Sequence, residues 1–148
     1  MNGVRSLKIL IADDSSDDIF LLEQAFKKAG VETQLSHACN GQEAVDYLEG
    51  KGPFSDRVAY PLPDVLLLDL NMPHKDGFEV LEWWGQHPEF SLLLVYVLSA
   101  SARHTDVRRA YELHAHGYVV KPSQMADLIK FVAALSQWHQ FALVPNQT

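Results

Sequence analysis

Cysteine is almost absent from this 148-residue chain, with Cys39 as the single example. One cysteine cannot form an intramolecular disulfide, which fits a reducing, cytoplasmic setting, and we expect Cys39 to be a small buried residue. Long apolar runs are also missing: the longest, 65–68 and 92–98, are far too short to span a bilayer. The polar N-terminus, 1–7, lacks the pattern of a signal peptide.

Positive charge is scarce as well. The chain has 12 Lys and Arg against 19 Asp and Glu, a net charge of −7, and no basic cluster longer than Arg108-Arg109. Proteins that bind nucleic acids concentrate positive charge on one face, so we expect no nucleic-acid partner. The length fits one domain with a sizeable core.

Short apolar runs alternate with helical patterns five times along the chain. The runs predict strands at Leu7 to Ala12, Thr33 to Ala38, Asp64 to Leu68, Leu92 to Leu98 and Tyr118 to Val120. The helical stripes are Ile19, Leu22, Phe26 and Ala29; Ala44, Val45 and Leu48; Phe78, Leu81 and Trp84; Val107, Ala110, Tyr111 and His114; and Leu128, Phe131, Val132, Leu135 and Trp138. This alternation predicts an α/β fold, a doubly wound five-stranded parallel sheet with helices on both faces.

Two helix starts carry local signals, and one segment breaks the alternation. Ser15 with Asp18, and Asp76 with Glu79, have the spacing of capping boxes. The segment 49–63 has no apolar periodicity and is expected to be a long loop. Loops of this length are often functional, although a tolerated insertion without a role is an equally good interpretation.

Chemically useful side chains follow four of the predicted strands. They are the pair Asp13-Asp14, then Asp69, Ser99 and Lys121. In a doubly wound sheet the carboxyl ends of the strands meet at one edge, so we expect these groups to converge. Carboxylates with an ammonium and a hydroxyl suit one hard cation and one phosphoryl group. Repulsion between the carboxylates should raise at least one pKa.

Each residue alone also has a plain structural explanation. Asp69 could be a turn former or helix cap, and Asp13-Asp14 could favour the positive end of a helix. Ser99 could be a helix cap and Lys121 a solvated surface residue. Tyr118 could be an ordinary core aromatic. It is improbable that the first four explanations all hold for residues at one sheet edge. Their combination therefore favours a functional site.

The motifs resemble those of a known family. From Leu7 to about Trp138 the chain is similar to the receiver domain of two-component response regulators, a flavodoxin-like fold, and we expect a single receiver domain over 1–148 with a core of about 7–139 and a short tail, 140–148. The matching motifs are the acidic pair Asp13-Asp14, the pattern D-x-x-M-P-x-x-D-G from Asp69 to Gly77, Ser99-Ala100, and Tyr118 before Lys121-Pro122.

The resemblance implies roles for these residues. Asp69 would accept a phosphoryl group from a histidine kinase or a histidine phosphotransfer protein, and Lys121 would pair with a phosphoryl oxygen. Ser99 and Tyr118 would be switch residues that change the surface of the fourth helix, fifth strand and fifth helix, a surface also implied for homodimerisation. The Lys121-Pro122 bond would be cis.

The resemblance also implies a metal site. Mg²⁺, with Mn²⁺ able to substitute, would be bound by the side chains of Asp14 and Asp69 and by the backbone carbonyl of Asn71. Asp13 would hold a metal-bound water. No membrane partner is implied.

A narrower resemblance concerns the loop 49–63 and the aromatic tail Trp138-His139-Gln140-Phe141, which ends near Pro145. Both are similar to the small stand-alone receivers that partner bacterial phytochromes. This subgroup implies a phytochrome as the sensor kinase, although other single-domain regulators carry similar insertions. The expected output is a protein contact or relay of the phosphoryl group to another histidine protein.

Two other functions stay open at this point. A phosphatase of the haloacid-dehalogenase-like class would need an acid/base Asp two residues after the nucleophile, where this chain has Asn71. A phosphorylation-independent interaction module would usually have lost the acceptor, the acidic pair or the lysine. We therefore expect a signalling protein rather than an enzyme, with only self-phosphorylation and self-dephosphorylation chemistry.

Overall fold

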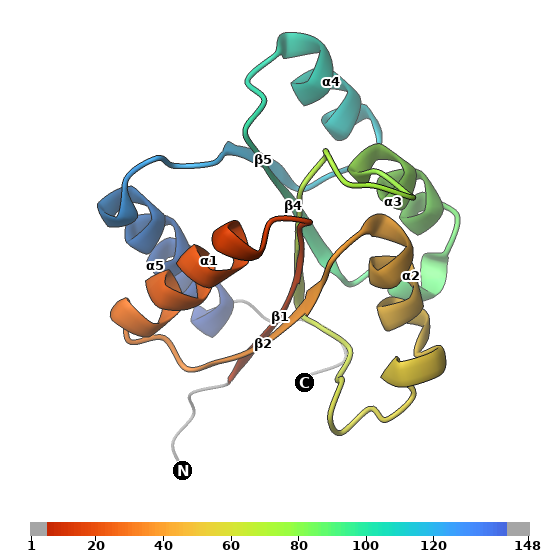
Figure 1. The fold of residues 1–148 in the computed structure, drawn as a ribbon, viewed down its shortest axis with the longest axis horizontal. Coiled ribbons are helices and arrows are strands. Elements are labelled where there is room, and N and C mark those ends of the chain that lie inside the picture. Colours follow the sequence, from red (N-terminus) through yellow and green to blue (C-terminus); the bar gives the residue numbers. More distant parts are fainter. Residues whose placement is uncertain (1–5, 142–148) are drawn as a thin grey trace.

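A computed structural model describes residues 6–141 and contains one five-stranded parallel sheet in the order β2-β1-β3-β4-β5 (Figure 1). The strands are β1 (Leu7–Ala12), β2 (Thr33–Ala38), β3 (Val65–Leu68), β4 (Leu94–Ser99) and β5 (Gly117–Val120). The predicted fold class is confirmed, with β3 and β4 starting one and two residues later than expected. Because Ala12 pairs with Leu68, the strands β1 and β3 end side by side.

Helices cover both faces of the sheet (Figure 1). The helices are α1 (Ser16–Lys28), α2 (Gly41–Glu49), α3 (Gly77–Gly85), α4 (His104–Glu112) and α5 (Met125–Phe141). Alternate residues of β3 point to opposite layers: Leu66 and Leu68 pack with α2 and α3, while Val65 and Leu67 pack with α1 and α5. All four residues of β3 are buried, as expected for a central strand covered on both faces. None of the helices in residues 6–141 has the length and apolar character needed to cross a membrane.

Several details differ from the sequence prediction. Tyr111 and Trp138 are each 49% exposed, and in α5 the buried positions include Ser136 and His139 instead. The rotation of a helix is set by the neighbour on which it packs, and α4 buries only Ala110 among its residues. Cys39 is exposed, so the expectation of a buried cysteine was wrong; it lies just beyond the edge strand β2.

The structure describes only the start of the expected tail, 140–148. Helix α5 continues through Phe141, so the first two residues of the expected tail are helical. The rest of that tail, 142–148, lies outside the described residues.

The expected loop 49–63 is folded against α2. It contains a 3₁₀ turn at Gly52–Phe54, and the rings of Phe54 and Tyr60 lie 5.2 and 6.0 Å from the ring of Tyr47. The guanidinium of Arg57 donates hydrogen bonds to the carbonyls of Tyr47 (2.8 Å) and Leu48 (2.7 Å) in the last turn of α2. The Tyr47 carbonyl also accepts from the N–H of Gly50 at 3.1 Å. Because the last carbonyls of a helix lack their full set of helical partners, Arg57 acts as an additional C-terminal cap.

Replacing Arg57 by Ala should therefore lower the free energy of unfolding by about 1 kcal/mol, because the carbonyls of Tyr47 and Leu48 each lose the hydrogen bond from the guanidinium. Urea unfolding at neutral pH measures this change. Arg57→Lys is the matched variant: it keeps the charge but lacks the planar fork that reaches two carbonyls, so it should recover little of the loss. Wild-type stability in both variants would contradict this role for Arg57.

Candidate functional site

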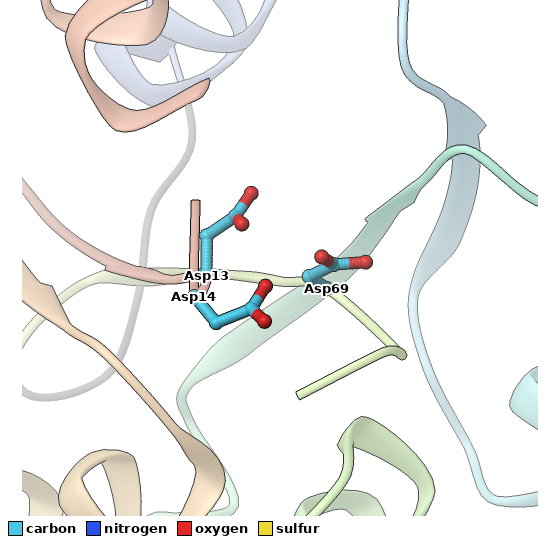
Figure 2. Close-up of side chains that lie close together, drawn as sticks. All are labelled: Asp13, Asp14 and Asp69. Atoms are coloured by element: carbon cyan, nitrogen blue, oxygen red, sulfur yellow. The ribbon is translucent and has the colours of Figure 1, made fainter. Parts of the chain in front are cut away.

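Three carboxylates meet at the carboxyl edge of the sheet, beyond β1 and β3 (Figure 2). Asp13 and Asp14 follow β1, and Asp69 follows β3, where its N–H donates to the carbonyl of Ala12 at 2.9 Å. One carboxylate oxygen from each of the three acidic residues lies within 4.8 Å of the others. Asp13 and Asp69 are buried and Asp14 is exposed, so the group opens to solvent on one side.

Lys121, the residue directly after β5, completes the site. Its backbone N–H donates to the carbonyl of Ser99 at 2.8 Å, which anchors the backbone beside β4. The Nζ atom of Lys121 lies 2.9 Å from Asp13 Oδ2 and 3.3 Å from Asp69 Oδ2. The structure thus brings together the acidic pair, Asp69 and Lys121, as their places at the strand ends predict.

The shortest ion pair of Lys121 is with Asp18, a residue whose spacing in the sequence predicts a helix-capping role instead. Asp18 Oδ2, in the first turn of α1, lies 2.7 Å from Lys121 Nζ. Sequence spacing predicts a capping box for Ser15 and Asp18, but only half of it forms: Ser15 Oγ accepts from the N–H of Asp18 at 3.2 Å. The carboxylate of Asp18 pairs with Lys121 instead, whereas Asp76 and Glu79 form the complete capping box expected at α3.

Burial and charge set the protonation behaviour of the site. Burial raises the pKa of Asp69, and the charge of Asp13 raises it further, while Lys121 and the N–H of Asn71 oppose the shift. Burial alone would lower the pKa of Lys121, but hydrogen bonds to Asp18 and Asp13 outweigh it and raise that pKa, which keeps the ammonium charged. The expected rise of a carboxylate pKa is present, with burial as its largest cause. The remaining excess of negative charge favours a cation.

Ser99 and Tyr118 are linked through the loop between β4 and α4. Ser99 is fully buried at the end of β4, and its Oγ accepts from the N–H of Ser101 at 3.1 Å. The hydroxyl of Tyr118 donates to the carbonyl of Ser101 at 2.8 Å. Ser101 Oγ in turn donates to Asp106 Oδ2 of α4 at 2.6 Å. Both predicted switch residues therefore contact one loop residue that is tied to α4.

The loop between β3 and α3 closes tightly behind Asp69. The N–H of Gly77 donates to the carbonyl of Leu70 at 3.0 Å, and a Cβ atom on Gly77 would collide with the backbone carbonyl of Asp69. The N–H of Asn71 lies 3.4 Å from Asp69 Oδ1. A hollow whose lining includes Asp14, Asn71 and Arg103 opens beside the acidic group, which gives a reacting molecule access to it.

The Lys121-Pro122 peptide bond is trans, as are all peptide bonds in residues 6–141, so the expectation of a cis bond was wrong. Trans is the intrinsic preference of a bond before proline, by about 0.5–1 kcal/mol. In this trans form, the side chain of Lys121 already reaches the carboxylates of Asp13 and Asp69.

Comparison with known proteins gives consistent matches. The family profile of the response regulator receiver domain matches residues 9–133. Response regulator Rcp1 of Synechocystis is 34% identical over 138 residues, covering 93% of this chain and 92% of Rcp1. The structure of its Mn²⁺-bound form has a TM-score of 0.80 at 32% identity, covering 93% of this chain and 97% of that one.

Two further solved structures are similar over nearly their whole length. Response regulator RPA3017, in red light signaling of R. palustris, has a TM-score of 0.85 at 32% identity, covering 94% of this chain and 98% of that one. The phosphorylated cyanobacterial phytochrome response regulator RcpA has a TM-score of 0.84 at 32% identity, covering 95% of this chain and 99% of its own.

Proposed function

Since this chain belongs to the response regulator receiver domain family, whose members take a phosphoryl group from histidine kinases, we propose that Asp69 is its acceptor residue. The chain is a phospho-accepting signalling protein, and we take all of 1–148 as one receiver domain. The observation that carries the assignment is the position of the Asp69 carboxylate, which is buried, 3.3 Å from the ammonium of Lys121 and within 4.8 Å of the acidic pair.

The proposed transfer is an in-line displacement at phosphorus. A carboxylate oxygen of Asp69 forms the new O–P bond as the P–N bond to the donor imidazole breaks, and the electron pair of that bond returns to the imidazole nitrogen. Lys121 donates to a phosphoryl oxygen where negative charge accumulates, which lowers the barrier electrostatically. The raised pKa of Lys121 supports this role because the donor stays an ammonium.

The donor atoms of the site suit a hard divalent cation, and receiver domains bind such ions. We propose Mg²⁺, with Mn²⁺ able to substitute, held by the carboxylates of Asp14 and Asp69 and by the carbonyl of Asn71. Asp13 would act through a water, because its Oδ1 accepts from the N–H of Ser15 at 2.9 Å and its Oδ2 pairs with Lys121. When bound, the ion neutralises charge on the phosphoryl oxygens.

The output is proposed to pass through Ser101. If Ser99 turns toward a phosphoryl group on Asp69, its contact with the N–H of Ser101 is lost, and Ser101 also holds the hydroxyl of Tyr118 and the carboxylate of Asp106. Phosphorylation would thereby change the surface of α4, β5 and α5. We propose that this surface contacts a protein partner, including a second copy of the chain, and that sedimentation with a phosphoryl mimic detects the dimer.

A phytochrome is proposed as the sensor kinase, by analogy with RcpA, a phytochrome response regulator, and RPA3017, which acts in red light signaling. The phosphatase alternative is not favoured, because the residue two positions after Asp69 is Asn71, whose amide cannot exchange a proton as an acid does. The phosphorylation-independent module is not favoured either, since the acceptor, the acidic pair and Lys121 are all present and adjacent.

Intact mass after incubation with acetyl phosphate tests the proposal. We expect a gain of one phosphate with Mg²⁺ or Mn²⁺ and little or none when EDTA removes the ion, because the clustered carboxylates then repel the anionic donor. Equal uptake with EDTA would contradict the metal assignment. No uptake from acetyl phosphate or from a phosphorylated histidine kinase would contradict the proposed function.

A further inference from the structure

Lys121 is held by an acidic residue that lies outside the strand ends. Asp18 comes from the first turn of α1, yet its Oδ2 is the carboxylate oxygen nearest to Lys121 Nζ, at 2.7 Å against 2.9 Å for Asp13 and 3.3 Å for Asp69. The side chain of Lys121 is 19% exposed and that of Asp18 is 37% exposed. The pair therefore lies at the margin of the site, where α1 meets the end of β5.

The number of donors on the ammonium matches the number of acceptors around it. An ammonium carries three N–H donors, and three carboxylate oxygens lie within 3.3 Å of Lys121 Nζ. A phosphoryl group on Asp69 would present an oxygen in place of the most distant of the three. Asp13 and Asp18 can then keep their hydrogen bonds, and the third donor is left pointing at the phosphoryl oxygen.

We propose that Asp18 is a positioning residue for phosphoryl transfer: its carboxylate fixes the ammonium of Lys121 so that one N–H is directed at the phosphoryl group on Asp69. This inference rests on the proposed function of Asp69. A lysine ammonium is a point charge on a flexible four-carbon stem, so without a second anchor it would divide its time among several partners and water. Because Asp18 holds the ammonium before the reaction, this freedom does not have to be lost when the transition state forms.

A purely structural role for Asp18 in α1 is separable from this one. Asp17 and Asp18 are both acidic residues in the first turn, where negative charge favours the helix N-terminus. Ser15 accepts from the backbone of Asp18 and not from its side chain, so the cap survives replacement of the carboxylate. Asp17 is exposed and lies beside Asp18 in sequence, which makes Asp17→Asn a control for both formal charge and helix dipole.

The test compares Asp18→Asn with Asp17→Asn and the wild type. Phosphorylation by acetyl phosphate with Mg²⁺ is followed by intact mass over a range of donor concentrations, and Mg²⁺ binding by calorimetry. For Asp18→Asn we expect a maximal rate about tenfold lower, the size of effect typical of an outer residue that orients a functional group. The half-saturating donor concentration and the Mg²⁺ affinity should match those of Asp17→Asn.

Several outcomes would overturn the inference. One is a wild-type maximal rate in Asp18→Asn, and another is an equal slowing in Asp17→Asn. A fall in Mg²⁺ affinity that parallels the fall in rate would indicate collapse of the site rather than lost orientation. If all three proteins take up phosphate at the same rate, the positioning role of Asp18 is wrong but the proposed function stands. If none of the three is phosphorylated, the proposed function is wrong as well.

Discussion

Replacing Asp69 by Asn is expected to reduce phosphoryl uptake below detection while raising the free energy of unfolding. An amide is a poor nucleophile, so the O–P bond does not form. The amide also has nearly the shape of the carboxylate and carries no charge. Because burial raises the pKa of Asp69, the ionised carboxylate is disfavoured in the folded state, and a neutral side chain removes that cost. Lys121 keeps Asp13 and Asp18 as partners.

The stability gain has a definite pH dependence. With a folded-state pKa above the unfolded one, the folded state binds more protons in the interval between them, and wild-type stability falls as pH rises through that interval. The advantage of Asp69→Asn should therefore be larger at pH 7 than at pH 4. Urea unfolding at both values measures it, with Asp127→Asn as an exposed control of the same chemistry. An Asp69→Asn variant that is less stable than the wild type at pH 7 would contradict the expected cost of burying the Asp69 carboxylate. A variant that still takes up phosphate would contradict the role of Asp69 as acceptor.

Replacing Gly77 by Ala should cost about 2–3 kcal/mol of unfolding free energy, the upper part of the range typical of an overpacked core. A Cβ atom at this position would collide with the carbonyl oxygen of Asp69 and lie 2.7 Å from the Cα atom of Leu70. The backbone cannot easily yield, because the N–H of Gly77 is bonded to the carbonyl of Leu70 and the capping box at Asp76 fixes the start of α3.

Gly85, in the same helix, is the matched control for that substitution. A Cβ atom on Gly85 would meet no atom within 4 Å, so Gly85→Ala should be neutral or stabilising by up to about 1 kcal/mol, as alanine is the better helix former. Thermal or urea unfolding of both variants gives the comparison. Gly77→Ala should also slow phosphorylation because it displaces Asp69. Equal stability of the two variants would show that the contact behind Asp69 is not rigid.

The convergence at the sheet edge was predictable from sequence, because it depends on strand order and strand ends alone. Asp69 and the acidic pair follow apolar runs that are adjacent once β1 pairs with β3, and Lys121 follows β5 in the same way. Whether these residues perform the proposed roles stays a prediction for the experiments above. The capping box at Asp76 was equally predictable, since its hydrogen bonds join residues three positions apart.

Other features depend on tertiary contacts that no local pattern reveals. Asp18 has the spacing of a helix cap, yet its carboxylate pairs with Lys121, 103 positions away. The order in 49–63 comes from Arg57 and from aromatic packing on Tyr47, and that segment has no periodicity to indicate it. Trp138 continues the apolar stripe of α5 in sequence but is half exposed, because the neighbouring elements set the rotation of the helix.

The most direct test of Asp69 as the acceptor is to locate the phosphoryl group in the sequence. Borohydride cleaves an aspartyl phosphate reductively and leaves homoserine at the modified residue, which peptide mass spectrometry then identifies. After incubation with acetyl phosphate and Mg²⁺, we predict homoserine at position 69 alone, and none in Asp69→Asn. Homoserine at Asp13 or Asp14 with an unmodified Asp69 would contradict the central claim.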